Sequence, residues 1–388
     1  MKKVAVIFGT RPDTIKLAPI ILELKRQRSS IRTITIATAQ HRQMLDQVLS
    51  VFKIDPDYDL NIMVPKQSLA LLTQNTVAAL DAVLEKEMPD LVLVQGDTTT
   101  TFVGSLAAFY RSIPVGHVEA GLRTHDKANP FPEEINRRLT SCIADLHFAP
   151  TETAKKALLH EHVGKERIFV TGNSVIDALN ISVRKNYTFG IHALNTLTAQ
   201  KKRIVLLTMH RRENLGEPMR SACEAVRELA ERYPDMNFIF PVHLNPLVRE
   251  VVYGTLGSLD NVYLLEPLDY LDFVNLMARS YLIITDSGGV QEEGPALGKP
   301  ILVLRKVTER PEAVEYGTVK LVGLNKRTIV GAAKKLIDSP AAYRAMASAT
   351  NPYGDGRAAE RTVRIITNEF GLTRTKVREF RPGRSHGR

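Results

Sequence analysis

Short apolar runs alternate with longer stretches in which apolar residues recur every three or four positions. The short, largely β-branched runs predict buried strands, and the longer stretches, such as residues 14–26 and 69–86, predict amphipathic helices. The predicted strands of the first half are residues 4–8, 34–37, 91–94, 114–118, 146–148 and 168–170. Those of the second half are residues 204–207, 238–241, 262–265, 282–284, 301–304 and 320–322.

This alternation predicts an α/β protein with two Rossmann-like domains, each a doubly wound parallel sheet covered by helices on both faces. The chain has 388 residues, too many for one ordinary core, and a weakly patterned stretch at residues 180–203 separates the two sets of elements. We predict an N-terminal domain over residues 1–175 and a C-terminal domain over residues 176–357. The last helical pattern, residues 358–370, is expected to pack back on the first domain.

The net charge of +10 first suggests nucleic acid as a partner, but much of it lies at the C-terminus. Residues 374–388 contain six basic residues against one acid, Glu379, and residues 371–388 are predicted to be a basic, disordered tail. Without a nucleic-acid-binding motif, no such partner is expected. With no leader pattern and no apolar run near the roughly 20 residues of a membrane span, a cytoplasmic protein without a membrane partner is expected.

One run, TDSGGVQEEGP at residues 285–295, joins a predicted strand to a predicted helix. Gly288 and Gly289 allow backbone N–H groups to approach phosphate oxygens at the start of the helix. Glu293, one turn further, is placed to accept both hydroxyls of a ribose. An ordinary strand-to-helix turn with solvated acids is the plain alternative for this run taken alone.

Charged side chains also follow the predicted strands of the first half. They are Arg11, Lys16, Asp97, Glu119, Glu133 and Glu134. The two basic residues next to a helix start suit an anionic ligand, although a solvated pair is the alternative. Helix capping accounts for one of the two adjacent glutamates, but not for so many carboxylates beyond the ends of parallel strands. His210, after the first strand of the second half, is a candidate acid or cationic stabiliser.

Other chemistries find less support. The acids with His117, His210 and His243 are an alternative metal site, but none of these three histidines is part of an HxH or HxxxH spacing, so no metal is predicted. The sequence has no GxGxxG fingerprint, no Walker loop and no GxSxG elbow, which weakens redox, phosphoryl-transfer and hydrolase interpretations.

Twelve ordered motifs carry a resemblance to a known family. They are FGTRP, QHR, GDTTTT, HVEAGLRT, PFPEEINRR, TGNSVIDAL, HRRENLG, PVHLNP, EPLDYLDFV, TDSGGVQEEGP, LGKPILVLR and TERPEAVEYGT. From residue 3 to about 369 the chain resembles the non-hydrolysing UDP-N-acetylglucosamine 2-epimerases. The resemblance implies a glycosyltransferase-B-like fold with the two domains facing a central cleft, and usually a homodimer. It also implies reversible conversion of UDP-N-acetylglucosamine to UDP-N-acetylmannosamine without a cofactor, for cell-surface polysaccharide.

The resemblance also assigns roles to residues. The implied catalytic residues are Asp97, Glu119, Glu133 and His210. The implied UDP-sugar ligands are Arg11, Lys16, Phe273 near the uracil, Ser287, Gly288, Gly289, Glu293 at the ribose, and Arg310. Because the hydrogen on carbon 2 is barely acidic, we expect elimination of UDP to 2-acetamidoglucal, followed by re-addition.

Some members of the family bind a second UDP-N-acetylglucosamine as an allosteric activator. The positions that look similar here are Gln40, Gln43, Gln67, Glu134 and Arg211, with Lys66 nearby. The usual RPEAIK of the family is RPDTIK in this chain, so the shorter Asp13 puts the anchoring of Arg11 in question.

Three rival activities share much of this pattern. An epimerase of a UDP-diacetamido-uronic acid shares nearly every motif and needs an additional basic partner for the substrate carboxylate. A glycosyltransferase shares the fold and the uridine site but needs an acceptor. A catalytically silent nucleotide-sugar sensor is disfavoured because the candidate carboxylates and His210 are all present.

Overall fold

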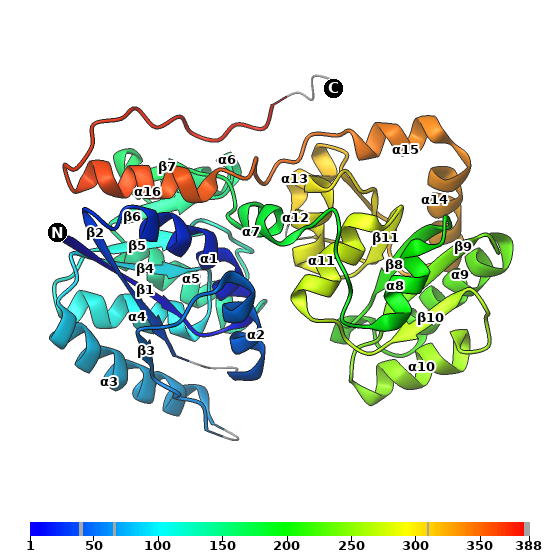
Figure 1. Ribbon diagram of the computed structural model, residues 1–388, viewed down its shortest axis with the longest axis horizontal. Coiled ribbons are helices and arrows are strands. Elements are labelled where there is room, and N and C mark those ends of the chain that lie inside the picture. The colour runs from blue at the N-terminus through cyan, green and yellow to red at the C-terminus, as the bar shows by residue number, and fades with distance from the viewer. Residues whose placement is uncertain (39–41, 65–66, 309, 384–388) are drawn as a thin grey trace. The chain divides into compact units, whose positions relative to one another are not determined.

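The computed structural model describes residues 1–38, 42–64, 67–308 and 310–383, of which 42–44 and 212 are described by backbone alone. The chain forms two compact units (Figure 1). Unit 1 comprises Met1–Asn180 and Tyr353–Arg381, and unit 2 comprises Ile181–Pro352 with residues 382–383. The change of unit at Asn180 lies inside α7 (Val175–Ser182), a few residues beyond the predicted boundary at 175.

Unit 1 is built on a seven-stranded sheet in the order β3-β2-β1-β4-β5-β6-β7, and all neighbouring strands are parallel. Its strands are β1 (Lys2–Phe8), β2 (Ile31–Ala37), β3 (Tyr58–Asp59), β4 (Leu91–Gln95), β5 (Val115–Val118), β6 (Leu146–Ala149) and β7 (Ile168–Val170). Six of these were predicted. The edge strand β3 was missed because its two residues form no apolar run.

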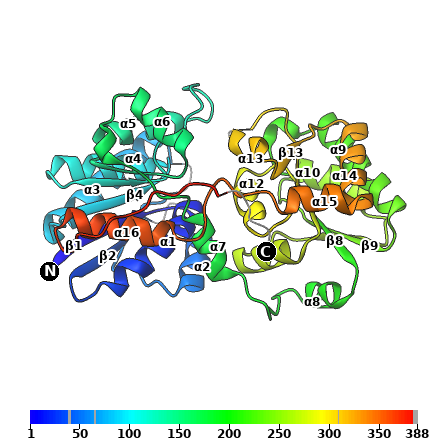
Figure 2. The same ribbon diagram turned by 90° about the horizontal axis from the view of Figure 1, so that it is seen from above.

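Helices cover both faces of this sheet, with α3 and α4 on one side and α1 and α16 on the other (Figure 2). The helices of unit 1 are α1 (Arg11–Arg26), α2 (Arg42–Phe52), α3 (Leu69–Glu87), α4 (Thr99–Tyr110), α5 (Glu133–Ile143), α6 (Glu152–His160), the short 3-10 helix η1 (Lys165–Arg167), most of α7, and α16 (Ala358–Glu369). Cys142 on α5 is exposed.

Unit 2 has a six-stranded parallel sheet in the order β10-β9-β8-β11-β12-β13. The strands are β8 (Arg203–Thr208), β9 (Met236–Pro241), β10 (Val262–Leu265), β11 (Leu282–Thr285), β12 (Ile301–Val303) and β13 (Val319–Leu321). The helices are α8 (His192–Ala199), η2 (Arg212–Asn214), α9 (Glu217–Arg232), α10 (Pro246–Leu256), α11 (Tyr270–Arg279), α12 (Gly288–Ala296), α13 (Pro311–Glu315), α14 (Lys326–Asp338) and α15 (Pro340–Ala347).

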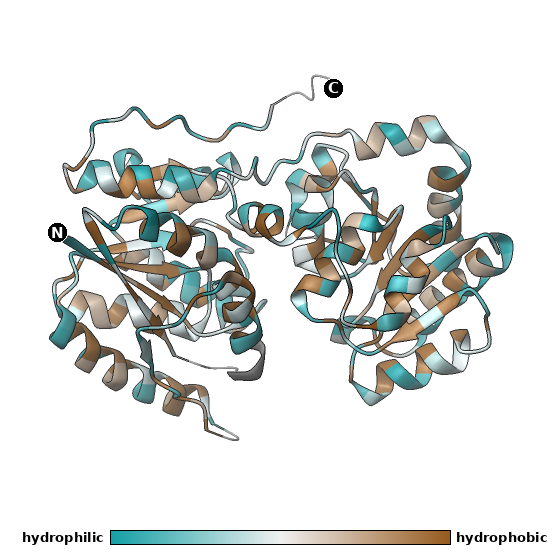
Figure 3. Cartoon of the chain, viewed as in Figure 1, coloured by the Kyte–Doolittle hydropathy of each residue, from teal (hydrophilic) through white to brown (hydrophobic). Residues whose placement is uncertain are grey.

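Each unit has its own core. The inner strands are buried along their whole length because helices cover both faces, and Figure 3 shows hydrophobic residues concentrated on them. Phe148 in unit 1 and Phe238 and Phe240 in unit 2 are among the largest fully buried side chains. Each such side chain contributes about 1.5–3 kcal/mol through burial. None of the helices in the described part of the chain is both long and apolar enough to span a membrane.

The final helix α16 packs on α1 within unit 1. Asp177 of α7 accepts hydrogen bonds from the backbone N–H groups of Ala358 at 3.1 Å and Ala359 at 2.9 Å, at the start of α16. These N–H groups have no partner inside the helix, so a carboxylate is favourable there. Burial raises the pKa of Asp177 to about 6.

The C-terminal segment of unit 1, residues 371–381, is held on that unit by specific contacts. Phe380 is buried, and its N–H group donates to the oxygen of Val170 at 2.7 Å. Glu379 forms an ion pair of 2.7 Å with Lys155. The basic composition suggested disorder here, whereas one aromatic ring and one acid anchor the segment on unit 1. The rest of the predicted tail, residues 384–388, lies outside the described residues.

The strand order reverses between β1 and β4 in unit 1 and between β8 and β11 in unit 2. Ligands of doubly wound sheets bind beyond the carboxyl ends of the strands at such switch points. Arg11 and Asp97 follow β1 and β4, and His210 and Ser287 follow β8 and β11. Each unit therefore carries part of the predicted site at its own switch point.

Candidate active site

The turn between β1 and α1 is organised by Asp13. Its buried carboxylate accepts bonds from the backbone N–H groups of Gly9 at 3.1 Å, Thr10 at 2.8 Å and Thr14 at 2.8 Å. Burial raises its pKa to about 6, and these bonds oppose the increase. The start of α1 is thus occupied by the chain's own acid, while Arg11 forms no ion pair with any residue that the structure describes. Asp13, the residue that departs from the usual motif, therefore fixes the backbone of this turn, and it does not fix the side chain of Arg11 through an ion pair.

Glu119, just after β5, lies in a network of polar side chains. It forms an ion pair with Lys16 of α1, and its Oε2 accepts a bond of 2.8 Å from Nδ2 of Asn173. Its side chain is nearly buried, and its φ of 62° is in the left-handed region, which costs a non-glycine residue of order 1–3 kcal/mol. Such strain is typical of sites where a side chain must be aimed in one direction.

Asp97, just after β4, is held from α5. Its carboxylate forms an ion pair with Arg137, and its backbone oxygen accepts a bond of 2.9 Å from Asn136. Glu133 begins the same helix, and its Oε2 is buried without a hydrogen-bond partner among the described residues. Asp97, Glu119 and Glu133 thus follow β4, follow β5 and begin α5 in unit 1, and two of the three have a cation beside them.

The structure describes only some of the residues that were assigned to an activator site. Gln40 and Lys66 lie outside the described residues, as does the side chain of Gln43. Gln67 Oε1 accepts a bond of 3.2 Å from the N–H of Val64. These positions remain a prediction.

Glu134, another of the predicted activator ligands, has a structural task in unit 1. It is fully buried, and its two carboxylate oxygens accept bonds from the backbone N–H groups of Thr124 at 3.0 Å and His125 at 3.2 Å. It also lies 3.6 Å from Arg137. A contact with a second nucleotide would require these bonds to open.

In unit 2 the carboxyl ends of β8 and β11 lie side by side, with Thr208 paired to Thr285. His210 follows the first strand and Asp286 the second, and His210 Nδ1 lies 3.3 Å from the Asp286 carboxylate. Burial lowers the pKa of His210, and the charge of Asp286 opposes this shift. Arg211, the fifth predicted activator ligand, lies 3.7 Å from Glu213.

The predicted phosphate turn lies at the start of α12. Ser287 is its N-cap, and Gly288 and Gly289 are its first two residues. The guanidinium of Arg310 lies next to this turn. A methyl group added to Gly288 would be 2.8 Å from its Nη1. The guanidinium is fixed by Glu292 of α12 through a bond of 2.6 Å.

Two further predicted ligands lie on helices of unit 2. Glu293 is nearly buried one turn along α12, and its Oε2 lies 4.0 Å from the position of a methyl group on Gly289. Phe273 is half-buried on α11. Unit 2 thus presents backbone N–H groups, a guanidinium and a carboxylate along one helix start.

His117 and His243, the other two histidines considered as metal ligands, lie in different surroundings. His117 is fully buried and donates from Nε2 to the oxygen of Gly96 at 2.8 Å, and burial lowers its pKa to about 3. The ring of His243 stacks on that of His210 with centroids 6.1 Å apart. Within the described part of the chain, no three metal-ligating side chains come together.

A model of the family described as UDP-N-acetylglucosamine 2-epimerase matches residues 23–367. The chain is 53% identical over 378 residues to the UDP-N-acetylglucosamine 2-epimerase of Bacillus subtilis, covering 97% of this chain and 98% of that one. The chain belongs to the UDP-N-acetylglucosamine 2-epimerase family. It is therefore an isomerase, and both the predicted family and the predicted class of enzyme are confirmed.

Solved structures of epimerases agree with this assignment. The UDP-GlcNAc 2-epimerase from Neisseria meningitidis, bound to UDP-GlcNAc, has a TM-score of 0.85 at 51% identity and covers 94% of this chain and 100% of its own. The Staphylococcus aureus protein MnaA, solved with UDP, has a TM-score of 0.87 at 51% identity and covers 98% and 100%. The predicted fold class, two parallel-sheet α/β domains of the glycosyltransferase-B type, is confirmed.

Several residues that hold the candidate groups of this epimerase were not predicted from its sequence. Asn173 holds Glu119, Arg137 holds Asp97, and Asp286 holds the loop of His210, while Lys16, which was predicted as a ligand, also pairs with Glu119. Each missed partner stood inside a quoted motif, TGNSVIDAL, PFPEEINRR or TDSGG. What was missing was their pairing, since contacts between residues 40 to 103 positions apart leave no mark on local spacing.

Proposed function

We propose that the protein interconverts UDP-N-acetylglucosamine and UDP-N-acetylmannosamine. The observation that carries the proposal is that Asp97 and Glu119 follow neighbouring strands of unit 1, with Glu133 at the start of α5, in a chain about half identical to UDP-N-acetylglucosamine 2-epimerases. An inversion at carbon 2 needs proton removal on one face of the sugar and proton delivery on the other. Several fixed carboxylates supply both.

The chemistry of the substrate favours elimination. No carbonyl lies next to carbon 2, so its proton leaves only when another bond takes up the electron pair. Loss of that proton forms the double bond between carbons 1 and 2 as the bond from carbon 1 to UDP breaks, which gives 2-acetamidoglucal and UDP. Re-addition of UDP at carbon 1, with a proton delivered to the opposite face of carbon 2, gives the epimer.

In this proposal, residues of unit 2 bind the nucleotide part of the substrate. Ser287, Gly288 and Gly289 bind the diphosphate, and the backbone N–H groups at the start of α12 stabilise it as it leaves. Glu293 binds the ribose and Phe273 the uracil.

Cationic groups assist the leaving diphosphate. Arg310 stands over the phosphate turn, and Arg11, Lys16 and His210 contribute positive charge or a proton to the oxygen that leaves. Positioned acid and base groups of this kind supply factors of about a hundred to ten thousand each.

The proposal extends to assembly and regulation. We expect a homodimer, and a second UDP-N-acetylglucosamine bound as an activator by Gln40, Gln43, Gln67, Glu134 and Arg211. The product would serve cell-surface polysaccharide synthesis. Activation is tested with UDP-N-acetylmannosamine alone, which should turn over slowly until UDP-N-acetylglucosamine is added; immediate hyperbolic turnover would contradict it.

The deciding experiment is incubation of the protein with UDP-N-acetylglucosamine in deuterated water, followed by proton NMR. We expect UDP-N-acetylmannosamine with deuterium at carbon 2. Asp97→Asn and Glu119→Gln should each slow exchange by about a hundredfold or more, whereas Glu152→Gln, at an exposed position of α6, should not. Neither product nor exchange would overturn the proposal; turnover of the diacetamido-uronic acid nucleotide or transfer to an acceptor would then identify one of the rival enzymes.

A further inference from the structure

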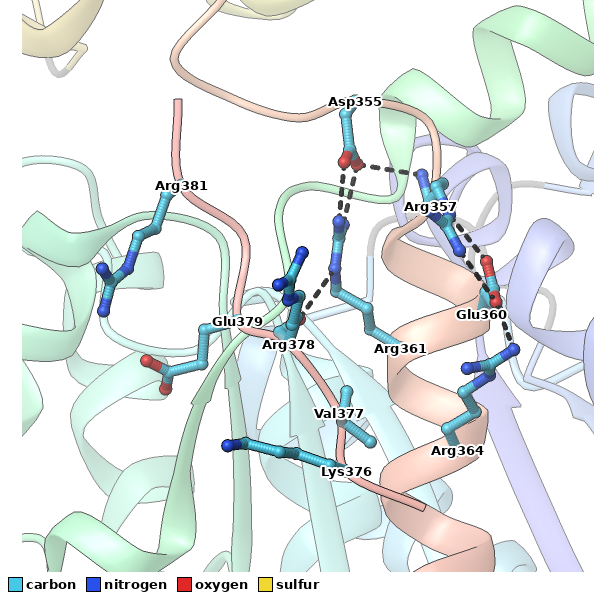
Figure 4. A pocket seen from close by; sticks show the side chains of 10 residues that line it. All are labelled: Asp355, Arg357, Glu360, Arg361, Arg364, Lys376, Val377, Arg378, Glu379 and Arg381. Atoms are coloured by element: carbon cyan, nitrogen blue, oxygen red, sulfur yellow. Dashed lines mark hydrogen bonds and ion pairs between the residues drawn. The ribbon is translucent and has the colours of Figure 1, made fainter. Parts of the chain in front are cut away.

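A cleft of about 770 Å³ lies between α16 and the C-terminal segment, entirely within unit 1 (Figure 4). Nine of its ten lining residues are charged, and Val377 is the exception. The lining residues are Asp355, Arg357, Glu360, Arg361, Arg364, Lys376, Val377, Arg378, Glu379 and Arg381. We call this the basic cleft. Its volume is in the range of small-ligand sites, which is about 300–1,000 Å³.

The wall formed by the C-terminal segment is fixed at both ends. Near the end of α16, Asn368 Nδ2 donates to the oxygen of Thr375 at 2.7 Å, and the N–H of Thr375 returns a bond of 3.0 Å. At the other end, the N–H of Phe380 donates to Val170 at 2.7 Å. Between these anchors, Arg361 of α16 donates to the oxygen of Arg378 at 3.2 Å. The cleft is therefore framed by ordered backbone.

All three carboxylates of the basic cleft are already compensated. Asp355 takes a two-pronged bond from Arg361, at 2.6 and 2.7 Å. Glu360 is paired with both Arg357 and Arg364. Glu379 is paired with Lys155, which is not one of the lining residues.

Three cations of the C-terminal segment have no such partner. Lys376, Arg378 and Arg381 are exposed, and none forms an ion pair with any residue in the part of the chain described. Figure 4 shows no dashed line at the charged ends of their side chains, and it shows Lys376 and Arg381, with Glu379, on the side of the segment away from α16 in this view. Like charges gathered on one ordered segment repel one another unless an anion joins them.

We propose that the basic cleft binds a small, multiply charged phosphate compound. Arginine predominates, and its planar fork matches phosphate oxygens in pairs. A hollow lined almost wholly by charged groups has no place for an apolar ligand. The single apolar lining residue gives no wedge for insertion into a lipid surface, and the aromatic ring of Phe380 is buried rather than offered to a base. The chemistry thus favours a compact polyphosphate over a membrane or a nucleic acid.

The site is separate from the proposed nucleotide turn at Ser287, which lies in unit 2, so the test does not depend on epimerase activity. Tripolyphosphate is titrated into the full-length protein by calorimetry at physiological ionic strength. The triple variant Lys376→Ala, Arg378→Ala, Arg381→Ala removes the three cations. A matched triple control, Lys156→Ala, Lys165→Ala, Arg374→Ala, removes the same charge from exposed positions of unit 1 outside the cleft.

We expect the wild type and the control to bind one more equivalent of tripolyphosphate than the cleft variant, or to bind it at least about tenfold more tightly, since each exposed charge pair contributes a few-fold. The proposal is overturned if the wild type binds no tripolyphosphate, or if the control loses as much binding as the cleft variant. It is also overturned if only anionic vesicles or an oligonucleotide distinguish the cleft variant from the wild type. Circular dichroism and the melting temperature of both variants establish that they are folded.

Discussion

The buried carboxylate of Asp286 anchors the loop that carries His210. It accepts bonds from the backbone N–H groups of His210 and Arg211, each at 3.0 Å, and from the side chain of Asn214 at 2.9 Å. It also lies 3.3 Å from Nδ1 of the His210 ring. Asp286 directly precedes Ser287 in the chain. The residue whose carboxylate orients the loop of His210 is therefore adjacent to the proposed phosphate turn.

Asp286→Asn tests whether this anchor sets the properties of His210. Removal of the charge should lower the pKa of His210 further, because Asp286 now opposes the effect of burial. If His210 acts in its protonated form, the alkaline limb of the pH profile of kcat moves to lower pH. We also expect kcat to fall by about tenfold or more, as for a misplaced acid.

The control for Asp286→Asn is Asp260→Asn, an exposed position of unit 2 that should leave the pH profile unchanged. A lower kcat with an unshifted alkaline limb would mean that Asp286 only supports the fold of the loop.

Asn173 provides a test of how Glu119 is held. Its Nδ2 donates to Glu119, while its Oδ1 accepts from the N–H of Val175 at 3.1 Å. Asn173→Asp keeps the acceptor but replaces the donor by a second carboxylate, which repels that of Glu119. We expect kcat to fall more in Asn173→Asp than in Asn173→Ala, with little change in KM, because the change acts on Glu119, which we propose as a proton-transferring group.

Steady-state kinetics of both Asn173 variants make this measurement, and melting temperatures show whether folding is affected. Equal losses of kcat in the two variants, or a change confined to KM, would count against a role for Asn173 in positioning Glu119.

More of the fold than of the candidate site could be predicted from the sequence. Parallel strands such as β4 and β11 are buried on both faces, so a continuous apolar run marks them, whereas the edge strand β3 has no run at all. Site residues were marked by glycines and charges after strands, but their partners come from distant parts of the chain. Lys16 beside Glu119 follows from strand order, which places the end of β1 near those of β4 and β5.

Composition misled at the C-terminus for a related reason. The segment has the charge and low apolar content of disordered chain, yet Phe380 finds a buried position and Glu379 finds Lys155. A single anchoring side chain contributes little to average composition, so only the folded unit reveals it.

Gly288→Ala tests the proposed phosphate turn. The added methyl group would lie 2.8 Å from Nη1 of Arg310, so the guanidinium must move, and its bond to Glu292 must change. We expect KM for UDP-N-acetylglucosamine to rise by roughly tenfold, since a charge-assisted contact is worth about 1.5–3 kcal/mol. Gly331→Ala, on α14 with open space around it, is the control and should leave KM unchanged. An unchanged KM in Gly288→Ala would remove Arg310 from the diphosphate site.

The buried His117 is expected to make the stability of unit 1 sensitive to acid. Burial lowers its pKa to about 3, and that of His147 on the paired strand to about 4, so the folded form binds fewer protons than the unfolded chain between pH 6.5 and these values. Both histidines therefore contribute stability above pH 6.5 that is lost as the pH falls.

His117→Gln keeps a donor for Gly96 but cannot titrate. Its melting temperature should fall less than that of the wild type between pH 7.5 and 5, by roughly 4–8 °C, because about 2 kcal/mol of proton linkage is removed. His192→Gln, at an exposed position of α8, should behave as the wild type. An equal loss in His117→Gln and the wild type would place the acid sensitivity elsewhere in the unit.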